Sequence, residues 1–365
     1  MPSKRTPLLL IVLVVILNGC RQERAPMNLV DFPARNSPNY QGLVSVHWLK
    51  KLLDYKDDPS QNPRPDTYAH NRFVVLEASW ASLADATDYH AGHVPGAYHL
   101  NTDEFENGYP QWRLREPADL QATIGRMGIT PNTTVIVYGK QPTAAARVWW
   151  VLKFSGVSDV RILDGGFEAW SNAGYPIEKA TNTQQPTPFE APVATNILAT
   201  TKYIRDRLDS TEFWMADVRS DDEFAGVKSG YSYLSAKGRI PNAIAVGDAG
   251  DGAFIYLQED HRLRNPKEIL DRWREQGIVP AKENSHQFER EVIFYCGGGW
   301  RSSLAFFYAW LEGFENIRNY SDGWSGWSTI YSPDPDIKGI TPGWQQIPTA
   351  NPIETSISET DATPK

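Results

Sequence analysis

Short apolar segments alternate with segments of helical periodicity along most of the chain. Phe73-Val-Val-Leu76 and Val135-Ile-Val-Tyr138 have little polar alternation, which is typical of central strands in a parallel sheet. Between Leu304 and Leu311, apolar residues recur at i, i+3, i+4 and i+7, which places them on one face of a helix. The alternation predicts an α/β fold in which crossover helices join parallel strands.

The chain contains an internal repeat of this pattern. Four blocks of the first half have counterparts, in the same order, in the second half, and the last two pairs share one offset of 157 positions. The paired blocks are 75–78 with 215–218, 92–97 with 238–243, 135–138 with 292–295, and 163–170 with 320–327. We therefore expect two copies of one domain, each a parallel sheet with helices on both faces.

Composition changes mark the expected domain boundaries. Residues 181–197 are rich in Pro, Thr and Gln, which favour neither a helix nor a β-strand. This composition predicts a linker between the copies. The first copy then occupies residues 41–180 after a polar lead at 21–40, and the second occupies residues 198–345. Residues 346–365 are rich in Thr, Ser and Pro, and we expect a flexible tail there.

The first twenty residues have the pattern of an export signal. Lys4 and Arg5 precede an uninterrupted apolar run from Leu8 to Leu17, which is shorter than the roughly 20 residues that a membrane-spanning helix needs. The sequence that follows, Leu17-Asn-Gly-Cys20, resembles the lipobox of bacterial lipoproteins. That resemblance implies lipidation at Cys20 and a lipid-anchored protein on the periplasmic side of a bacterial membrane; an ordinary cleaved signal or a simple anchor are the alternatives.

Charge and cysteine content narrow the function further. A net charge of -8 disfavours nucleic acid as a partner, because such binding depends on clustered Lys and Arg. The chain has two cysteines, so lipidation of Cys20 leaves Cys296 as the single thiol of the mature protein. An unpaired thiol is a liability in an oxidising compartment unless it is buried or used. Cys296 is therefore the first candidate for chemistry.

The segment around Cys296 has the features of an anion-stabilising loop. A buried strand ends at Tyr295, three glycines follow the cysteine, and a helix begins beyond them. The active-loop candidates are Gly297, Gly298, Gly299, Trp300, Arg301 and Ser302. Glycine N–H groups and a helix N-terminus stabilise an anion, and such surroundings with a nearby cation lower the pKa of a cysteine from about 8.5. Cys296 follows the carboxyl end of a parallel strand, and open α/β sheets place their reactive crevice at the carboxyl ends of their strands.

These motifs together resemble the rhodanese family. Cys296-Gly-Gly-Gly-Trp-Arg301 is similar to the family's Cys-x-x-Gly-x-Arg loop, and Gly92-His-Val-Pro-Gly-Ala97 and Asp164-Gly-Gly-Phe-Glu-Ala-Trp170 match its other hallmarks. The resemblance covers about Gly42 to Trp327, in the tandem arrangement of thiosulfate and 3-mercaptopyruvate sulfurtransferases. It implies Cys296 as the catalytic nucleophile, with no metal and no organic cofactor.

The first copy lacks this chemistry. At the fixed offset, Cys296 corresponds to Gly139 and Arg301 to Ala144, so the nucleophile and the charge are missing together. The resemblance implies an inactive first domain that packs against a catalytic second one. His93 and Glu77 are candidates for a cleft between the domains, with turn and strand-end roles as the alternative.

Candidate substrate-binding residues also follow from the family pattern. Asp217, Arg219 and Arg239 are expected near the active loop, with a solvated surface role as the alternative for the two arginines.

The implied reaction begins with a small anionic sulfur donor. The Cys296 thiolate takes the outer sulfur of thiosulfate, or the thiol sulfur of 3-mercaptopyruvate, as a persulfide and releases sulfite or pyruvate; cyanide or a thiol, including a protein thiol, then removes the sulfur. The loop ending Trp300-Arg301 resembles that of single-domain and periplasmic thiosulfate enzymes, which favours thiosulfate, whereas the small, glycine-rich loop resembles that of the mercaptopyruvate branch.

Two other classes of function remain open. A rhodanese-fold cysteine phosphatase is disfavoured because four residues, not five, separate Cys296 from Arg301. A scaffold or sulfur-carrier module is the other alternative.

Overall fold

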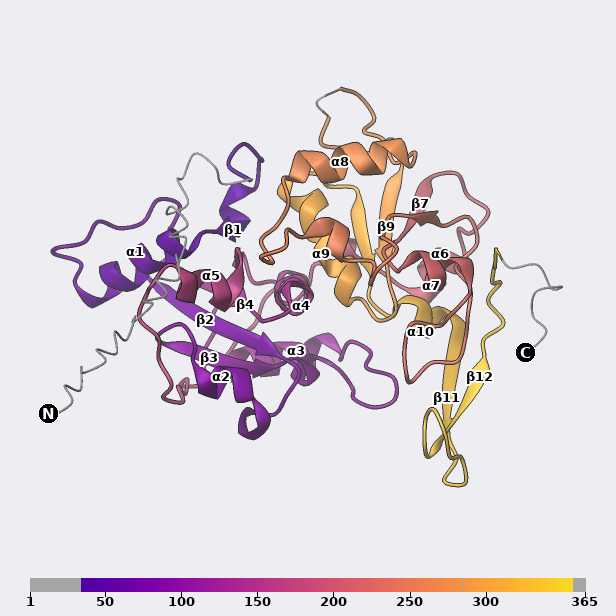
Figure 1. Cartoon of the computed structure of the whole chain (residues 1–365), viewed down its shortest axis with the longest axis horizontal. Coiled ribbons are helices and arrows are strands. Elements are labelled where there is room, and N and C mark those ends of the chain that lie inside the picture. The colour runs from indigo at the N-terminus through magenta and orange to yellow at the C-terminus, as the bar shows by residue number, and fades with distance from the viewer. Residues whose placement is uncertain (1–33, 284, 357–365) are drawn as a thin grey trace, which may run out of the picture.

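Two five-stranded parallel sheets with the same strand order form the framework of the molecule. The computed structural model describes residues 34–283 and 285–356 (Figure 1). One sheet has the order β1-β5-β4-β2-β3 and the other β6-β10-β9-β7-β8, so the second repeats the first element by element. This confirms the predicted tandem α/β architecture.

The strands of the first domain are β1 (Leu43–Val44), β2 (Arg72–Ser79), β3 (Ala97–Asn101), β4 (Thr133–Tyr138) and β5 (Asp159–Leu163). Those of the second are β6 (Leu198–Ala199), β7 (Phe213–Asp217), β8 (Ile244–Ala245), β9 (Glu291–Tyr295) and β10 (Ile317–Tyr320). An antiparallel pair, β11 (Thr329–Pro333) and β12 (Trp344–Pro348), follows the second sheet.

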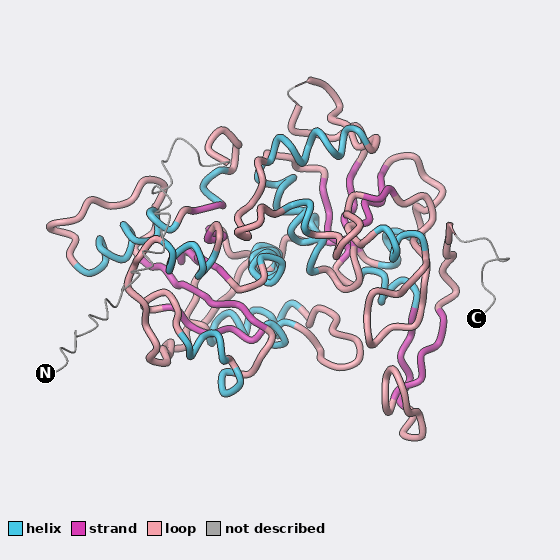
Figure 2. Tube along the Cα trace, in the orientation of Figure 1, coloured by secondary structure: helices cyan, strands magenta, loops and turns pink. Residues whose placement is uncertain are grey.

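The helices of the first domain are α1 (Val46–Asp57), α2 (Thr87–Ala91), α3 (Pro117–Arg126), α4 (Pro142–Phe154) and α5 (Gly166–Asn172). Those of the second are α6 (Thr201–Arg205), α7 (Asp221–Ala225), α8 (Pro266–Glu275), α9 (Trp300–Leu311) and α10 (Gly323–Ser328). Figure 2 shows the strands enclosed between helices and long loops.

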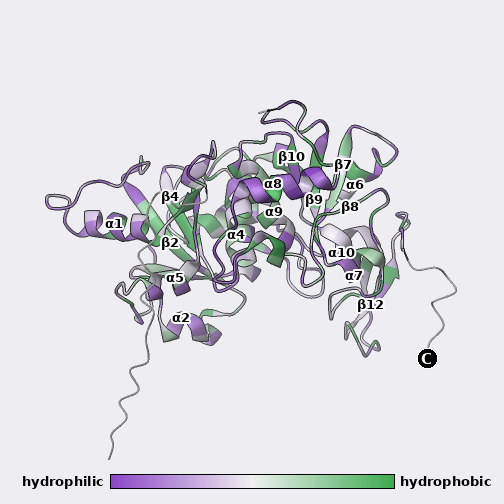
Figure 3. Cartoon of the chain, turned by 45° about the horizontal axis from the view of Figure 1, so that its top comes forward, coloured by the Kyte–Doolittle hydropathy of each residue, from purple (hydrophilic) through white to green (hydrophobic). Residues whose placement is uncertain are grey.

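Alternate residues of the central strands explain why helices lie on both faces. Val74 and Leu76 of β2 pack into a core with α3 and α4, whereas Val75, between them, packs with α1 and α5. In the second domain, Phe294 of β9 faces α8 and α9, and Ile293 faces α6 and α10. Successive side chains of a strand point to opposite faces, so a strand that is apolar throughout requires cover on both. Figure 3 shows the green apolar strands inside and the purple polar surface of α8 outside.

The two domains share one continuous core through α4 and α9, the helices that follow equivalent strands. Trp149 of α4 lies 4.8 Å, between ring centroids, from both Phe307 and Trp310 of α9, and the two helices run side by side in Figures 1 and 3. The sequence predicted one apolar face for the helix at 304–311. The structure instead buries Ala305, Phe306 and Ala309 as well, because the other domain covers that side of α9.

The expectation of a flexible tail over residues 346–365 is wrong for its described part. Residues 344–348 form β12, which pairs with β11 in antiparallel register. Beyond it, Glu354 forms a backbone bridge with Arg239, and the Trp327 indole donates to the carbonyl of Pro352 at 2.8 Å. Backbone pairing and a buried tryptophan hold this segment in spite of its polar composition.

Two predicted features of the N-terminus, the export signal and lipidation at Cys20, lie outside the described residues. Within residues 34–283 and 285–356, no helix combines the length and apolar character needed to cross a bilayer.

Candidate active site

The Cys296 loop lies at the carboxyl edge of the second sheet, between β9 and α9. Parallel pairing aligns Tyr295 with Asp217, so the ends of β7 and β9 meet beside the loop. Cys296 is 1% exposed and unpaired. The backbone carbonyls of Cys296 and Gly297 accept hydrogen bonds from Trp324 and Ser325 of α10, at 2.7 and 3.0 Å. The repeated block at 320–327 thus holds the catalytic loop in place.

The three glycines of the loop differ in the space around them. A Cβ on Gly297 would lie 1.9 Å from the Tyr231 ring, and one on Gly299, where φ is +87°, would lie 2.7 Å from Nη1 of Arg147. A Cβ on Gly298 would meet nothing within 4 Å. Two of the three glycines are therefore required by close packing and by backbone conformation, whereas the space over Gly298 is open.

The surroundings of Cys296 favour its thiolate. Burial alone would raise the pKa of the thiol, but the charge of Arg301 and the N–H groups of Ser302 and Gly298 outweigh it and hold the pKa below its ordinary value. The Ser302 hydroxyl lies 3.7 Å from Sγ and 2.7 Å from Oδ1 of Asn319, and its proton can serve either acceptor. A thiolate is the nucleophilic form of cysteine.

Arg301 is held in a fixed orientation by Glu223. Its Nη1 and Nη2 donate to the two carboxylate oxygens at 2.9 and 2.8 Å, and it also contacts the Tyr231 hydroxyl and the Asp251 carbonyl. Glu223 is in turn fixed by a capping box with Ser220 at the start of α7. The bidentate pair keeps a permanent positive charge beside the thiol.

Aromatic side chains of the second domain lie beside the Cys296 loop, and one from the first domain packs against them. Tyr231 packs on Gly297, and Tyr233 is close enough to Cys296 that the thiolate charge, after burial, helps to raise the pKa of its phenol. Trp112, on a hairpin of the first domain, lies 4.7 Å from Tyr233 between ring centroids. The first domain therefore forms part of the approach to the active loop.

A buried ion pair of the first domain also reaches the loop. Oε1 of Glu106 accepts from the Trp300 indole at 3.0 Å and from Nη2 of Arg147 at 3.3 Å, and Nη1 of Arg147 donates to Ser321 at 2.9 Å. Glu106 and Arg147 are 2% and 1% exposed. Through these contacts, Glu106 and Arg147 connect the first domain to Trp300 of the active loop and to Ser321, which follows β10.

The model of the rhodanese-like domain matches residues 73–173 and 200–330, which are the two repeats. The chain belongs to the rhodanese family. The thiosulfate sulfurtransferase YnjE of Escherichia coli is 33% identical over 300 residues, covering 80% of this chain and 64% of YnjE. The chain thus spans less than two thirds of that relative's length. A 3-mercaptopyruvate sulfurtransferase of Mus musculus is 23% identical, over 81% of this chain and 94% of the relative.

Solved structures of the family superpose on this rhodanese. The crystal structure of YnjE has a TM-score of 0.71 at 32% identity and covers 89% of this chain and 70% of its own. A structure of EanB, solved as a cysteine persulfide with ergothioneine, has a TM-score of 0.73 at 30% identity, over 88% and 72% of the two chains.

The predicted substrate-binding residues have different places in this rhodanese. Arg219 is 1% exposed, paired with Asp217 at 2.7 Å and packed over the rings of Tyr295 and Trp324. Its Nη1 has no hydrogen-bond partner among the described residues. Arg239 binds Glu354 of the C-terminal segment at 3.4 Å and donates to the carbonyl of Phe224, next to Glu223, at 3.3 Å. The structure therefore places Asp217 and Arg219 in the framework of the site, with Arg239 paired to the C-terminal segment beside α7.

The first-domain candidates do not converge on Cys296. His93 is fully buried, stacked on Tyr89 and bonded to its carbonyl at 2.8 Å. Glu77 is buried with His99, at 2.7 Å, and lines a pocket to which His261 and Leu263 of the second domain also contribute, so it lies at a cleft between the domains. His93 thus has the turn role that was its alternative.

Several residues of the site were not predicted from the sequence. Two of them, Glu223 and Arg147, could have been found: Ser220-Asp-Asp-Glu223 has the capping-box pattern, and Arg147 interrupts an apolar helical run between Ala146 and Val148. Tyr231, Tyr233 and Glu106 left none, because they lie in irregular segments whose position depends on the tertiary fold.

Proposed function

We propose that this rhodanese is a sulfurtransferase that moves a sulfane sulfur from thiosulfate to a thiophilic acceptor through a persulfide on Cys296. The observation that carries the proposal is the buried thiol with a lowered pKa, between the Arg301 guanidinium and the N–H groups of Gly298 and Ser302.

The proposed reaction balances without an external oxidant or reductant. The thiolate of Cys296 attacks the outer sulfur of thiosulfate, a sulfur–sulfur bond forms on the enzyme, and the bond inside thiosulfate breaks as sulfite leaves with its electron pair. The acceptor then attacks the terminal sulfur and restores the thiolate; with cyanide, the product is thiocyanate. The N–H groups and Arg301 stabilise the anionic persulfide between the two steps.

The similar proteins support this route. YnjE and other relatives are named thiosulfate sulfurtransferases, and EanB has been solved as a cysteine persulfide. Thiosulfate is the proposed donor, with 3-mercaptopyruvate as the competing one because a relative bears that name.

Intact-mass analysis after treatment with each donor tests the proposal. We expect the mass of one sulfur atom to be added by thiosulfate to the wild type and not to Cys296→Ser. A clear preference for 3-mercaptopyruvate would change the donor. Phosphate release from an aryl phosphate without any sulfur loading would replace the reaction by that of a phosphatase.

The acceptor is tested separately with the loaded enzyme. Cyanide, a small thiol and trimethyl histidine, the natural substrate bound in a similar ergothioneine-synthesising enzyme of Chlorobium limicola, are compared for loss of the added sulfur. We expect cyanide and the thiol to unload Cys296.

We further propose that the protein is exported and lipid-anchored at Cys20, on the motif Leu17-Asn-Gly-Cys20. Metabolic palmitate labelling should mark the wild type and not Cys20→Ala. Equal labelling of the two would exclude the anchor.

A further inference from the structure

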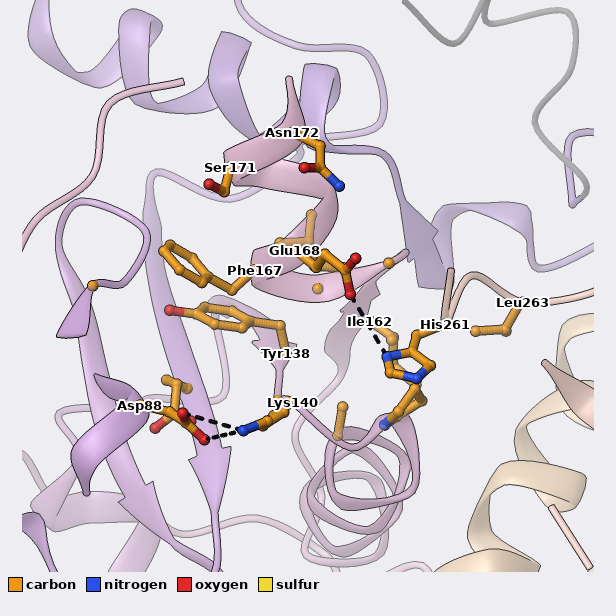
Figure 4. Close-up of a pocket in the computed structure, with 18 of the residues that line it drawn as sticks. Asp88, Tyr138, Lys140, Ile162, Phe167, Glu168, Ser171, Asn172, His261 and Leu263 are labelled. Atoms are coloured by element: carbon orange, nitrogen blue, oxygen red, sulfur yellow. Dashed lines mark hydrogen bonds and ion pairs between the residues drawn. The ribbon is translucent and has the colours of Figure 1, made fainter. Parts of the chain in front are cut away.

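A second pocket lies at the carboxyl edge of the first sheet. It has a volume of about 390 Å³ and is lined by the ends of β2, β4 and β5, by α5 and by the loop that begins at Gly139 (Figure 4). Gly139 is the residue that corresponds to Cys296, so the pocket occupies the place in the first domain that the active loop occupies in the second.

The two crevices are covered in a reciprocal way. In the first domain, a hairpin closed by the bridge Glu106–Leu114 carries Trp112, at φ +43°, toward the catalytic domain. In the second domain, a hairpin closed by the bridge Leu257–Leu263 carries His261, at φ +63°, to the edge of the first domain's pocket. Both apex residues adopt a left-handed backbone that non-glycine residues rarely take. One side of the first domain's pocket is therefore bordered by a hairpin of its neighbour, just as a hairpin of the first domain contacts Tyr233 beside the Cys296 loop.

Asp164 holds the second-domain hairpin against the first domain. Its Oδ1 accepts from the N–H of Leu263 at 2.8 Å, across the domain boundary, and its Oδ2 has no partner among the described residues. The residues on either side of it, Leu163 and Gly165, line the pocket. A buried carboxyl thus stands beside the pocket at the point where the hairpin docks.

The residues that line the first domain's pocket do not favour an anionic ligand. Pro142, which stands where Gly299 stands in the catalytic loop, has no N–H, and Ala144 replaces Arg301. The pocket cation Lys140 is paired with Asp88 at 3.0 Å. The cradle of N–H groups and positive charge that surrounds Cys296 therefore has no counterpart here.

The groups that remain suit a cation with an apolar body. Tyr138 and Phe167 place their rings against the pocket, as Figure 4 shows. Glu168 faces it from α5, and its Oε2 lies 4.0 Å from Nδ1 of His261. Apolar walls with one or two polar groups that fix orientation are characteristic of small-molecule sites. Aromatic rings and carboxylates both attract a positive charge.

We propose that this pocket is a second ligand site, for a small molecule that joins an aromatic or apolar body to one positive charge. The site is separate from the thiol and does not take part in sulfur transfer. Binding to it is a property of the intact two-domain chain, because His261 and Leu263 come from the catalytic domain.

Titration calorimetry with tryptamine tests the proposal, with indole-3-propionate as the probe of opposite charge. We expect saturable tryptamine binding to the wild type and to Cys296→Ser alike. Ser171→Trp, on the exposed mouth of the pocket, should abolish it. Glu168→Gln should weaken it about three- to fivefold, the scale of a partly exposed ion pair. Glu268→Gln is the matched control, because Glu268 is also an exposed acid in the first turn of a helix.

Four results would each overturn the proposal. One is the absence of saturable tryptamine binding to the full chain. Another is binding that Ser171→Trp leaves unchanged. The third is equal affinity for indole-3-propionate, which would remove the charge preference. Loss of binding in Cys296→Ser would also contradict it, by moving the site to the thiol.

Discussion

At the scale of single residues, the reactivity of the thiol depends on one guanidinium. Burial opposes ionisation of Cys296, and the charge of Arg301 is the first of the contributions that lower its pKa. Arg301 is itself placed by Glu223, which is 3% exposed. The charge beside the Cys296 thiol thus depends on a chain of contacts from α7 to α9.

Replacing Arg301 by Gln should raise the pKa of Cys296, because burial then acts with less opposition. The alkylation rate of the thiol by iodoacetamide, followed against pH, should have its midpoint displaced to higher pH. Sulfur transfer should fall about a hundredfold, as on removal of one electrostatic stabiliser of an active site. Arg239→Gln, at the arginine bound to Glu354, is the control and should leave the midpoint unchanged. An unchanged midpoint in Arg301→Gln would contradict this role.

Asp164 should make the protein less stable as the pH rises. Burial raises the pKa of this carboxyl from 3.8 to about 7, so the folded state holds a proton that the unfolded state releases. For an acid with a raised pKa, the free energy of unfolding falls between the two pKa values, here from about pH 4 to 7, by ~4 kcal/mol at most.

Urea unfolding of Asp164→Asn against wild type checks this. The variant should gain stability relative to the wild type as the pH rises through that range. Asp271→Asn, at a surface acid whose pKa is lowered by its bond to Lys267, should show a small difference of opposite sign. A wild-type minus variant difference that does not change with pH would contradict the assignment.

At the scale of elements, the catalytic loop distinguishes two neighbouring glycines. Gly297→Ala would drive a Cβ into the Tyr231 ring, whereas Gly298→Ala places it in open space. We expect Gly297→Ala to lose about 1–3 kcal/mol of stability, the usual cost of overpacking, and most of its sulfur loading. Gly298→Ala should keep both the fold and the reactive thiol, since the N–H of residue 298 is retained. Equal behaviour of the two variants, in urea unfolding and mass analysis, would contradict the packing argument.

The sequence predicted those elements whose structure depends on local pattern. The buried strands β2 and β4, the helix after Cys296 and the glycine loop are visible as apolar runs and residue types. The pairing of β12 with β11 was missed because its polar, exposed residues lack the period of a half-buried strand. The contacts of Tyr231 and Glu106 with the loop were missed because the fold, not the local sequence, brings distant segments together. The pairing of Arg239 with Glu354 was not predicted, because it depends on the position of the C-terminal segment in the fold.

At the scale of the whole molecule, the first domain contacts the loop of the second domain that carries Cys296. Its helix α4 shares a core with α9, and its hairpin places Trp112 against Tyr233. The reciprocal hairpin of the second domain closes the first domain's pocket. The first domain, which has Gly139 and Ala144 where the second has Cys296 and Arg301, therefore still contributes contacts to the Cys296 loop.

The buried pair Glu106–Arg147 should therefore control both the stability of the chain and the state of the loop. Glu106→Gln or Arg147→Met leaves one buried charge without its partner, which costs about 3–5 kcal/mol. In the double variant no charge is stranded, so its loss of stability should be smaller than the sum of the two single losses. Thiol alkylation should change its pH profile most in Glu106→Gln, because Trp300, next to Arg301, loses its charged acceptor.

The exposed pair Asp88–Lys140 of the same domain provides the comparison for this cycle. Its side chains are 59% and 72% exposed, and the cycle of Asp88→Asn and Lys140→Met should give a coupling below about 1 kcal/mol. Urea unfolding of the full chain measures both cycles. If the buried pair were coupled no more strongly than this surface pair, or if its loss left the alkylation profile unchanged, the first domain would be a neighbour of the active site and not a part of it.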